Sequence, residues 1–129
     1  MQITIPVMLA IFHIVGPVPA DLGVNEGHLS PCPGPAHCAS AQWQVADASE
    51  AIQRLATVIN ITPHTQIVDQ RNNYLHATYS SKIFGFVDDL ELYATNDLTL
   101  EARSISRIGE SDLGVNEKRL KRLTETLKS

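Results

Sequence analysis

The sequence predicts one α+β domain, a four-stranded antiparallel sheet with helices packed mainly on one of its faces. The chain has 129 residues, the size of one ordinary domain, and it is 43% hydrophobic and 19% charged, as globular proteins are. Four strand-like segments follow one another between two segments with helical periodicity. The predicted order is therefore helix-strand-strand-strand-strand-helix, which is typical of an α+β fold.

The N-terminal segment has the composition of an export signal. The first twenty residues contain no Lys, Arg, Asp or Glu, and residues 3–15 are almost wholly apolar. This run is shorter than the roughly 20 residues of a membrane span. Small residues up to Ala20 suit signal cleavage, although no basic residue precedes the run. We expect residues 1–20 to be a signal peptide or an N-terminal anchor, with membrane association through residues 3–18. Residues 21–129 would then form the domain, and a buried N-terminal strand of a protein that is not exported is the alternative.

Residues 21–43 are predicted to be irregular, because recurring proline and glycine exclude a helix or a central strand. Cys32 and Cys38 lie in this segment, and the five residues between them fit neither a zinc knuckle nor a C-x-x-C redox motif. A disulfide is the favoured interpretation, and it would contribute roughly 2 kcal/mol in the chain-entropy model. It also agrees with export. Free structural thiols and a zinc or copper site completed by His28 and His37 are the alternatives.

A helix is predicted after Asp47, which can cap it, with Glu50 three residues further on in a capping-box arrangement. Pro63 prevents its continuation. Apolar residues recur at helical spacing and should form one stripe against the sheet: Ala48, Ile52, Leu55, Ala56 and Ile59.

Two hairpins are predicted next. Strands over residues 65–71 and 74–82 flank Asn72-Asn73, and asparagine tolerates the positive φ of a tight turn. Strands over residues 86–93 and 98–107 flank a turn at residues 95–97.

A final helix is predicted over residues 115–127. Ser111 and Asp112 can supply its N-cap, and Asn116 lies in its first turn. The N-terminal end of this helix, beside Arg107, could also bind an anion. The buried stripe of the helix should consist of Leu120, Leu123 and Leu127.

The hexapeptide Asp-Leu-Gly-Val-Asn-Glu occurs twice, at residues 21–26 and 112–117. The sequences around the two copies differ, so they do not indicate a repeat array. A shared local turn, with glycine in a special backbone conformation, is the expectation.

Residues 84–89 read Phe-Gly-Phe-Val-Asp-Asp, and residues 111–116 read Ser-Asp-Leu-Gly-Val-Asn. With these blocks the sequence resembles the domain-of-unknown-function family 1499, and the resemblance covers nearly all of residues 22–127. It implies a small protein of bacteria, cyanobacteria or plastids, often with an N-terminal targeting or membrane segment, and it implies no activity. The chain has His37 where the family usually has Asn, which weakens the metal alternative, and Ala41 where the family usually has Ser.

Polar side chains are expected to gather on one face of the sheet. A two-residue turn at Asn72-Asn73 places Asp69 opposite His76. A three-residue turn at residues 95–97 places Asp89 opposite Arg103 and Asp88 opposite Ser104. The face then includes His76, Thr78, Asp89, Glu91, Arg103 and Arg107.

Three interpretations of this face remain open: cross-strand salt bridges, a pocket for an anion or small ligand, and catalysis by a histidine that a carboxylate orients. We expect Arg103 to pair with Asp89 or Glu91, and Arg107 to lie nearer the last helix, open to an anion. The ligand-binding candidates are His76, Asp89, Arg103, Ser104, Arg107, Ser111, Asp112 and Asn116. The weaker catalytic candidates are Asp69, His76, Asp88 and Asp89.

The net charge and the sequence motifs argue against several classes of function. A net charge of −4 argues against a nucleic-acid binder. Half of the Lys and Arg residues lie in residues 117–129, as on a solvated helix face or a tail that meets a membrane or an acidic partner. No P-loop, Gly-x-Ser-x-Gly or metalloprotease motif occurs, and we expect no metal or cofactor. The sequence favours an exported or membrane-associated, non-enzymatic module that binds a partner or a small anionic ligand. A small hydrolase-like enzyme using an Asp/His pair on the sheet is the alternative.

Overall fold

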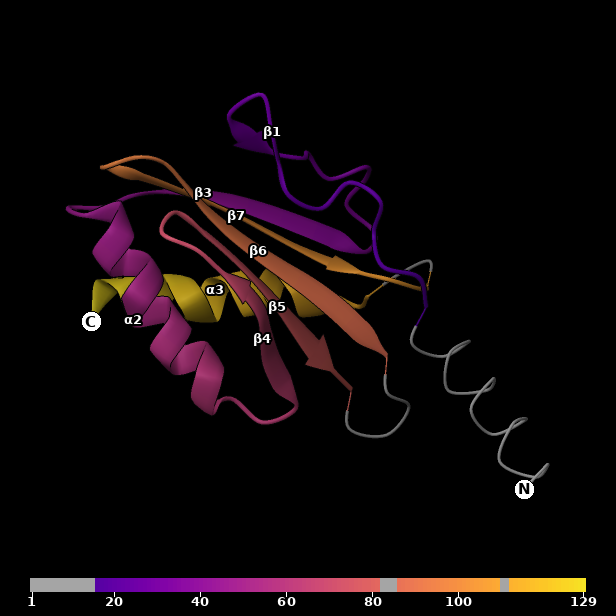
Figure 1. Ribbon diagram of the computed structural model, residues 1–129. Coiled ribbons are helices and arrows are strands. Elements are labelled where there is room, and N and C mark those ends of the chain that lie inside the picture. The colour runs from indigo at the N-terminus through magenta and orange to yellow at the C-terminus, as the bar shows by residue number, and fades with distance from the viewer. Residues whose placement is uncertain (1–15, 82–85, 110–111) are drawn as a thin grey trace, which may run out of the picture.

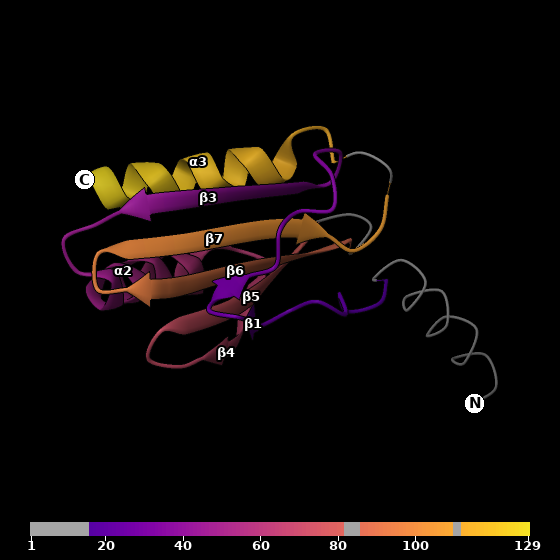
Figure 2. The ribbon, with the colours of Figure 1, turned by 90° about the horizontal axis from the view of Figure 1, so that it is seen from above.

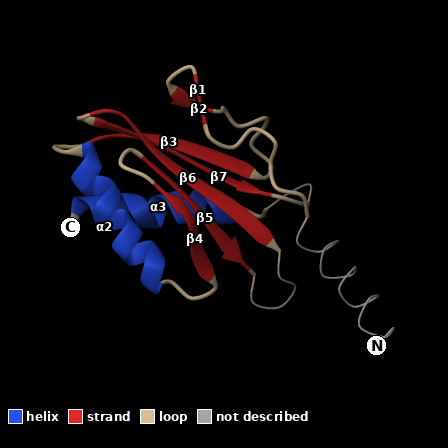
Figure 3. Cartoon of the chain, viewed as in Figure 1, coloured by secondary structure: helices blue, strands red, loops and turns tan. Residues whose placement is uncertain are grey.

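The computed structural model describes residues 16–81, 86–109 and 112–129. A five-stranded antiparallel sheet with the order β3-β7-β6-β5-β4 carries both helices on one face (Figures 1 and 3). The α+β class and the placement of the helices are as predicted, but the sheet has five strands and not four. The strands are β3 (Cys38–Gln44), β4 (Thr65–Gln70), β5 (Tyr74–Ser80), β6 (Val87–Asn96) and β7 (Thr99–Ser106), and the helices are α2 (Ala48–Ile61) and α3 (Val115–Lys128).

Strand β3 is the strand of the main sheet that the sequence analysis did not predict. The prediction of irregular structure up to Trp43 is wrong from Cys38 onward, because every proline of the segment precedes the strand. Alanine, serine and glutamine dominate β3, and they have low strand propensity. The strand forms through its pairing with β7, at the edge of the sheet. Before it lies a small separate hairpin of β1 (Val24–Asn25) and β2 (His28–Leu29).

Helix α2 confirms its sequence signals. The Asp47 carboxylate accepts a hydrogen bond from the Glu50 backbone N–H at 3.1 Å, and the helix ends at Ile61, before Pro63. All five residues of the predicted stripe are buried. They form the core together with Leu75, Leu90, Leu92 and Leu100 of the sheet and Leu120 and Leu123 of α3, while Leu127 packs against it partly buried.

The two hairpins differ in how well the sequence predicted their register. In β4–β5, Asp69 pairs with His76 as expected. In β6–β7, Asn96 pairs with Thr99, and the register shifts between Ala94 and Asn96. The turn is therefore one residue shorter than predicted and lies at residues 97–98. The expected pairings of Asp89 with Arg103 and of Asp88 with Ser104 are wrong by two residues. Instead, the pairs are Asp88–Ser106, Asp89–Ile105, Leu90–Ser104 and Glu91–Arg103.

Helix α3 begins at Val115, as predicted, but its N-cap is not Ser111 or Asp112. Gly114 is the N-cap, with φ 81°, and makes no side-chain cap. Asp112 still serves this end, because its carboxylate accepts hydrogen bonds from the backbone N–H groups of Gly114 (2.8 Å) and Asn116 (3.3 Å). Ser111 lies outside the described residues.

The repeated hexapeptide adopts two different structures. Its first copy forms β1, and its second copy leads into α3. The shared feature is the glycine with positive φ, at 98° for Gly23 and 81° for Gly114, as expected for a special turn conformation. The remaining structure of each copy is therefore set by its tertiary contacts.

Candidate functional site

The face of the sheet that the helices leave free is crossed by residues 16–37, which we call the strap (Figure 2). The strap forms hydrogen bonds with charged side chains of the sheet. The Asp21 carboxylate binds Arg103 through two hydrogen bonds of 2.9 and 3.0 Å. The backbone N–H of Gly23 donates to Glu91 at 2.6 Å, and that of Leu29 donates to Glu101 at 3.0 Å.

A disulfide between Cys32 and Cys38 ties the strap to β3. It is the pairing that the spacing favoured, and it leaves no thiolate to complete a metal site with His28 and His37. The His28 ring lies instead on Glu101, with Nδ1 2.7 Å from the carboxylate. No group of three or more metal-ligating side chains occurs within the described residues.

Beneath the strap, Glu91 and Arg103 form a buried ion pair, with 3.1 Å between Oε1 and Nη2 and 1% exposure on each side chain. The Tyr74 hydroxyl donates to Glu91 at 2.5 Å. Burial and this carboxylate raise the pKa of Tyr74 far above its usual range. Conversely, the hydrogen bond from Arg103 lowers the pKa of Asp21.

Asp89 holds a second cluster on the same face. Its carboxylate lies 2.7 Å from His76 Nε2 and accepts two hydrogen bonds from Arg107, of 2.8 and 3.1 Å. Burial of Asp89 would raise its pKa, but the hydrogen bonds from His76 and Arg107 outweigh it, and the pKa lies below its usual value.

The structure corrects the roles predicted for Asp69 and Arg107. Asp69 faces His76 in register, yet its carboxylate binds Arg71 at 2.8 Å and not the histidine. Arg107 is not open to an anion, because its guanidinium is bound to Asp89 and its side chain is only 10% exposed. Arg103 does pair within the sheet, with Glu91, as one of the two expected partners.

Among the predicted residues of the polar face, Arg103 lines a pocket, together with Glu101 of β7 and Leu29 of the strap. Four pockets of the described residues are lined by side chains other than His76, Asp89 and Arg107. A catalytic Asp/His pair needs reacting atoms within hydrogen-bond reach. His76 and Arg107 instead both bind Asp89 beneath the strap.

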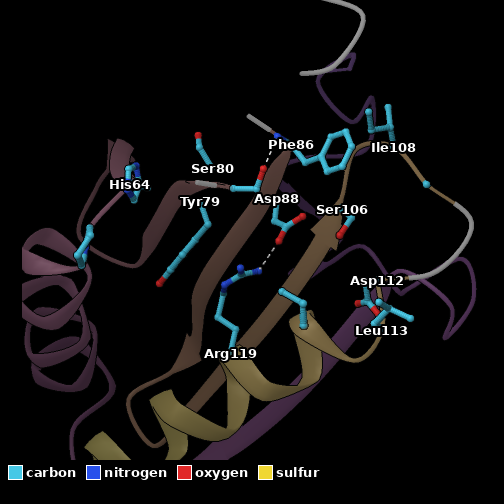
Figure 4. Close-up of a pocket in the computed structure, with 14 residues that line it drawn as sticks. His64, Tyr79, Ser80, Phe86, Asp88, Ser106, Ile108, Asp112, Leu113 and Arg119 are labelled. Atoms are coloured by element: carbon cyan, nitrogen blue, oxygen red, sulfur yellow. Dashed lines mark hydrogen bonds and ion pairs between the residues drawn. The ribbon is translucent and has the colours of Figure 1, made fainter. Parts of the chain in front are cut away.

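A pocket of about 440 Å³ lies on the opposite, helix-covered face, where the ends of β5, β6 and β7 meet the N-terminal end of α3 (Figure 4). Three apolar side chains on its lining are exposed: Phe86 by 44%, Leu113 by 85% and Val115 by 43%. Its size is within the range of about 300–1,000 Å³ usual for ligand pockets.

The polar part of this pocket is built around Arg119. Its Nη1 lies 3.0 Å from Asp88 Oδ2 and donates to Ser104 Oγ at 3.0 Å and to Asn116 Oδ1 at 2.9 Å. Its guanidinium carbon lies 4.1 Å from the centroid of the Tyr79 ring. Figure 4 shows Asp88 and Arg119 pointing toward each other.

Asn116 extends this cluster toward the start of the helix. It is fully buried, its amide donates to Ser106 Oγ at 2.9 Å and to Asp112 at 2.7 Å, and Ser104 Oγ donates to its carbonyl at 2.7 Å. A single amide thus joins α3 to β7.

The predicted ligand-binding residues therefore separate onto two faces of the sheet. Ser104, Asp112 and Asn116 join Asp88 on the helix-covered face, whereas His76, Asp89, Arg103 and Arg107 lie under the strap. Sequence reasoning missed Arg119, which it counted as one cation of the basic tail. The available signal was its spacing of three residues from Asn116, which places both on one side of the helix.

The two sequence blocks that carry the family resemblance both supply the lining of this pocket. Phe86 and Asp88 come from residues 84–89, and Asp112, Leu113 and Val115 come from residues 111–116. Within the described residues, no helix is long and apolar enough to cross a membrane.

Comparison with known proteins gives one family. No curated protein matches the chain. The family described as "Protein of unknown function (DUF1499)" matches residues 28–127, which is most of the chain. The chain therefore belongs to the DUF1499 family.

Proposed function

We propose that this protein is a non-enzymatic binding module, exported or membrane-associated, whose ligand occupies the pocket between the ends of β5, β6 and β7 and the start of α3. The observation that carries the proposal is an apolar rim beside a fixed polar cluster. Pockets that combine an apolar wall with a few convergent polar groups are the usual sites of small-ligand binding.

Leu113 supports the proposal most directly. Its side chain is 85% exposed, and its φ of 54° is a conformation that leucine rarely adopts. An exposed leucine in this conformation gains little from burial and carries a backbone cost, and such residues concentrate at ligand-binding sites. A ligand that covers the side chain would supply the missing burial.

The alternative of a hydrolase-like enzyme finds less support. His76 and Asp89 are buried under the strap with Arg107 on the same carboxylate. In the pocket, Asp88 is paired with Arg119. General acid–base catalysis needs a side chain that can exchange a proton with a substrate, and in both arrangements the carboxylate is already bound to an arginine.

The test is recovery of the bound molecule. The protein is purified from its own cells without detergent, and native mass spectrometry measures the mass that accompanies it. We expect a bound small molecule with the wild-type chain and with Leu98→Asn, and its loss with Leu113→Asn. Leu98 is a matched control because it is also exposed, by 56%, and lies outside the pocket. Equal retention by both variants would place the ligand elsewhere.

A further inference from the structure

Arg119 brings into the pocket hydrogen-bond donors that the protein does not use. All the hydrogen bonds and the ion pair that it makes with described residues go through Nη1. In the described part of the chain, the only buried side-chain nitrogen or oxygen without a partner is Arg103 Nε. Nη2 and Nε of Arg119 are therefore not sealed in the core, and the pocket is the open space that this side chain lines.

These donors are held in place before any ligand arrives. Asp88, Ser104 and Asn116 fix one end of the guanidinium, and the Tyr79 ring lies against its plane. The side chain is only 12% exposed. A fixed guanidinium loses little freedom on binding, and its Nη2–Nε edge presents two parallel N–H groups that match a carboxylate or phosphate.

The wall beside this edge is apolar. Phe86, Ile108, Leu113 and Val115 line the same pocket, and three of them are substantially exposed. A simple inorganic anion would contact the guanidinium and leave this wall in water. A purely apolar molecule would cover the wall and leave the donors without an acceptor.

We propose that the ligand is an anionic amphiphile, with its carboxylate or phosphate head on the Nη2–Nε edge of Arg119 and its apolar tail along the wall of Phe86, Ile108, Leu113 and Val115. This inference rests on the proposed function, since it assigns the chemistry of the same pocket. Asp88 neutralises part of the charge of Arg119, so recognition depends on the directed donors and not on a general positive field.

The test uses the purified wild-type chain and four probes at concentrations below micelle formation: decanoate, decanol, decyltrimethylammonium and acetate. Isothermal titration gives the affinities, and amide chemical shifts of residues 112–119 report the site. We expect decanoate to bind at least tenfold more tightly than decanol, and acetate not to bind measurably. Shortening the tail should weaken binding by up to about fourfold per methylene.

The outcomes distinguish a failure of this inference from a failure of the proposed function. Equal binding of decanoate and decanol would overturn the anionic head while leaving the apolar pocket in place. Tighter binding of decyltrimethylammonium would assign recognition to Asp88 and overturn it as well. Acetate binding as tightly as decanoate would remove the tail from the inference. Binding of none of the four would overturn both the inference and the proposed function.

Two variants connect the head group to Arg119. In Arg119→Gln, the preference for decanoate over decanol should disappear, with decanol affinity kept. Arg122→Gln is the matched control, because Arg122 lies on the same helix, is exposed and does not line the pocket. The thermal melt of each variant verifies folding. If Arg119→Gln does not fold, the comparison of the four probes on the wild-type chain still decides. A preference that survives in folded Arg119→Gln would overturn the assignment.

Discussion

Arg103 shows what a single buried charge does in this fold. It is 1% exposed and holds Glu91 of the sheet and Asp21 of the strap together. Removing one partner of a buried ion pair leaves the other charge unpaired, which costs about 3–5 kcal/mol. Arg103→Met should therefore lower the free energy of unfolding in urea by that amount.

A matched surface variant provides the control for this result. Lys121→Met breaks an exposed pair with Glu117 and should change the stability by about 0.5 kcal/mol or less. Arg107→Met should fall between the two, because Asp89 keeps its contact with His76 when Arg107 is removed. An Arg103→Met protein as stable as Lys121→Met would contradict the structural role.

The pH dependence of stability follows from Asp21 and Asp89, whose pKa values both lie below the usual value. A carboxyl group with a lowered folded pKa stabilises the fold above its unfolded pKa, near 4, and this contribution is lost as the pH falls through the folded pKa. We expect the free energy of unfolding to decrease below about pH 4. Asp21→Asn should show a smaller decrease than the wild type in urea titrations from pH 6 to pH 2. A steeper decrease in the variant would be inconsistent with the Asp21–Arg103 contact.

Substitution of Leu113 is expected to change the stability of the fold and the binding of the ligand in opposite directions. Asparagine tolerates positive φ better than leucine does, and little apolar burial is lost at an exposed position. Leu113→Asn should therefore raise the free energy of unfolding by roughly 0.5–1 kcal/mol while abolishing ligand retention. Leu98→Asn should stay within about 0.5 kcal/mol of the wild type. Urea denaturation of both variants measures this, and a destabilised Leu113→Asn would show that Leu113 serves the fold.

At the level of elements, the disulfide controls how firmly the strap is attached. Replacing both Cys32 and Cys38 by Ser removes a short closed loop and should lower stability by roughly 2 kcal/mol. Amide hydrogen exchange should accelerate at His28 and Leu29 more than at Leu90. Titration of the denatured, non-reduced wild type should find no free thiol, and two reactive thiols would exclude the bridge.

The elements that the sequence could predict are those whose signals are local. The Asp47 cap, the α2 stripe and the Asn72-Asn73 hairpin depend on residues a few positions apart. Strand β3 and the β6–β7 register do not: β3 has a weak intrinsic preference, and the turn at residues 97–98 together with the bulge near Asn96 places Arg103 opposite Glu91 and not Asp89. Alternation along β7 did place its charged residues on one face, because a shift of two residues preserves the side.

The candidate site was only partly predictable for a related reason. Sequence alternation showed which polar residues share a strand face, but not that the strap would cover one face and close it. Arg119 was hidden among the cations of the last helix, and its role depends on Asp88 and Tyr79, which are more than 30 residues distant along the chain. Contacts over such separations leave no periodic signal.

For the whole molecule, we propose export with removal of the N-terminal segment. The proposal is supported by the charge-free composition of residues 1–20 and is consistent with a disulfide. N-terminal sequencing of the native protein should begin at or near Asp21. An intact Met1 in a soluble cytoplasmic fraction would contradict it.

The strap also has a consequence for the order of folding. The sheet and both helices bury the main apolar cluster without it, since among the described residues none before Ala39 belongs to the cluster between sheet and helices. Apart from the Cys32–Cys38 disulfide and the buried Leu29, the strap attaches through hydrogen bonds to charged side chains of the sheet, which gain their strength only after the sheet has assembled. It should therefore join after the rate-limiting barrier. Substitutions at Asp21 would then accelerate unfolding and leave the refolding rate unchanged, whereas substitutions at Leu90 would slow refolding.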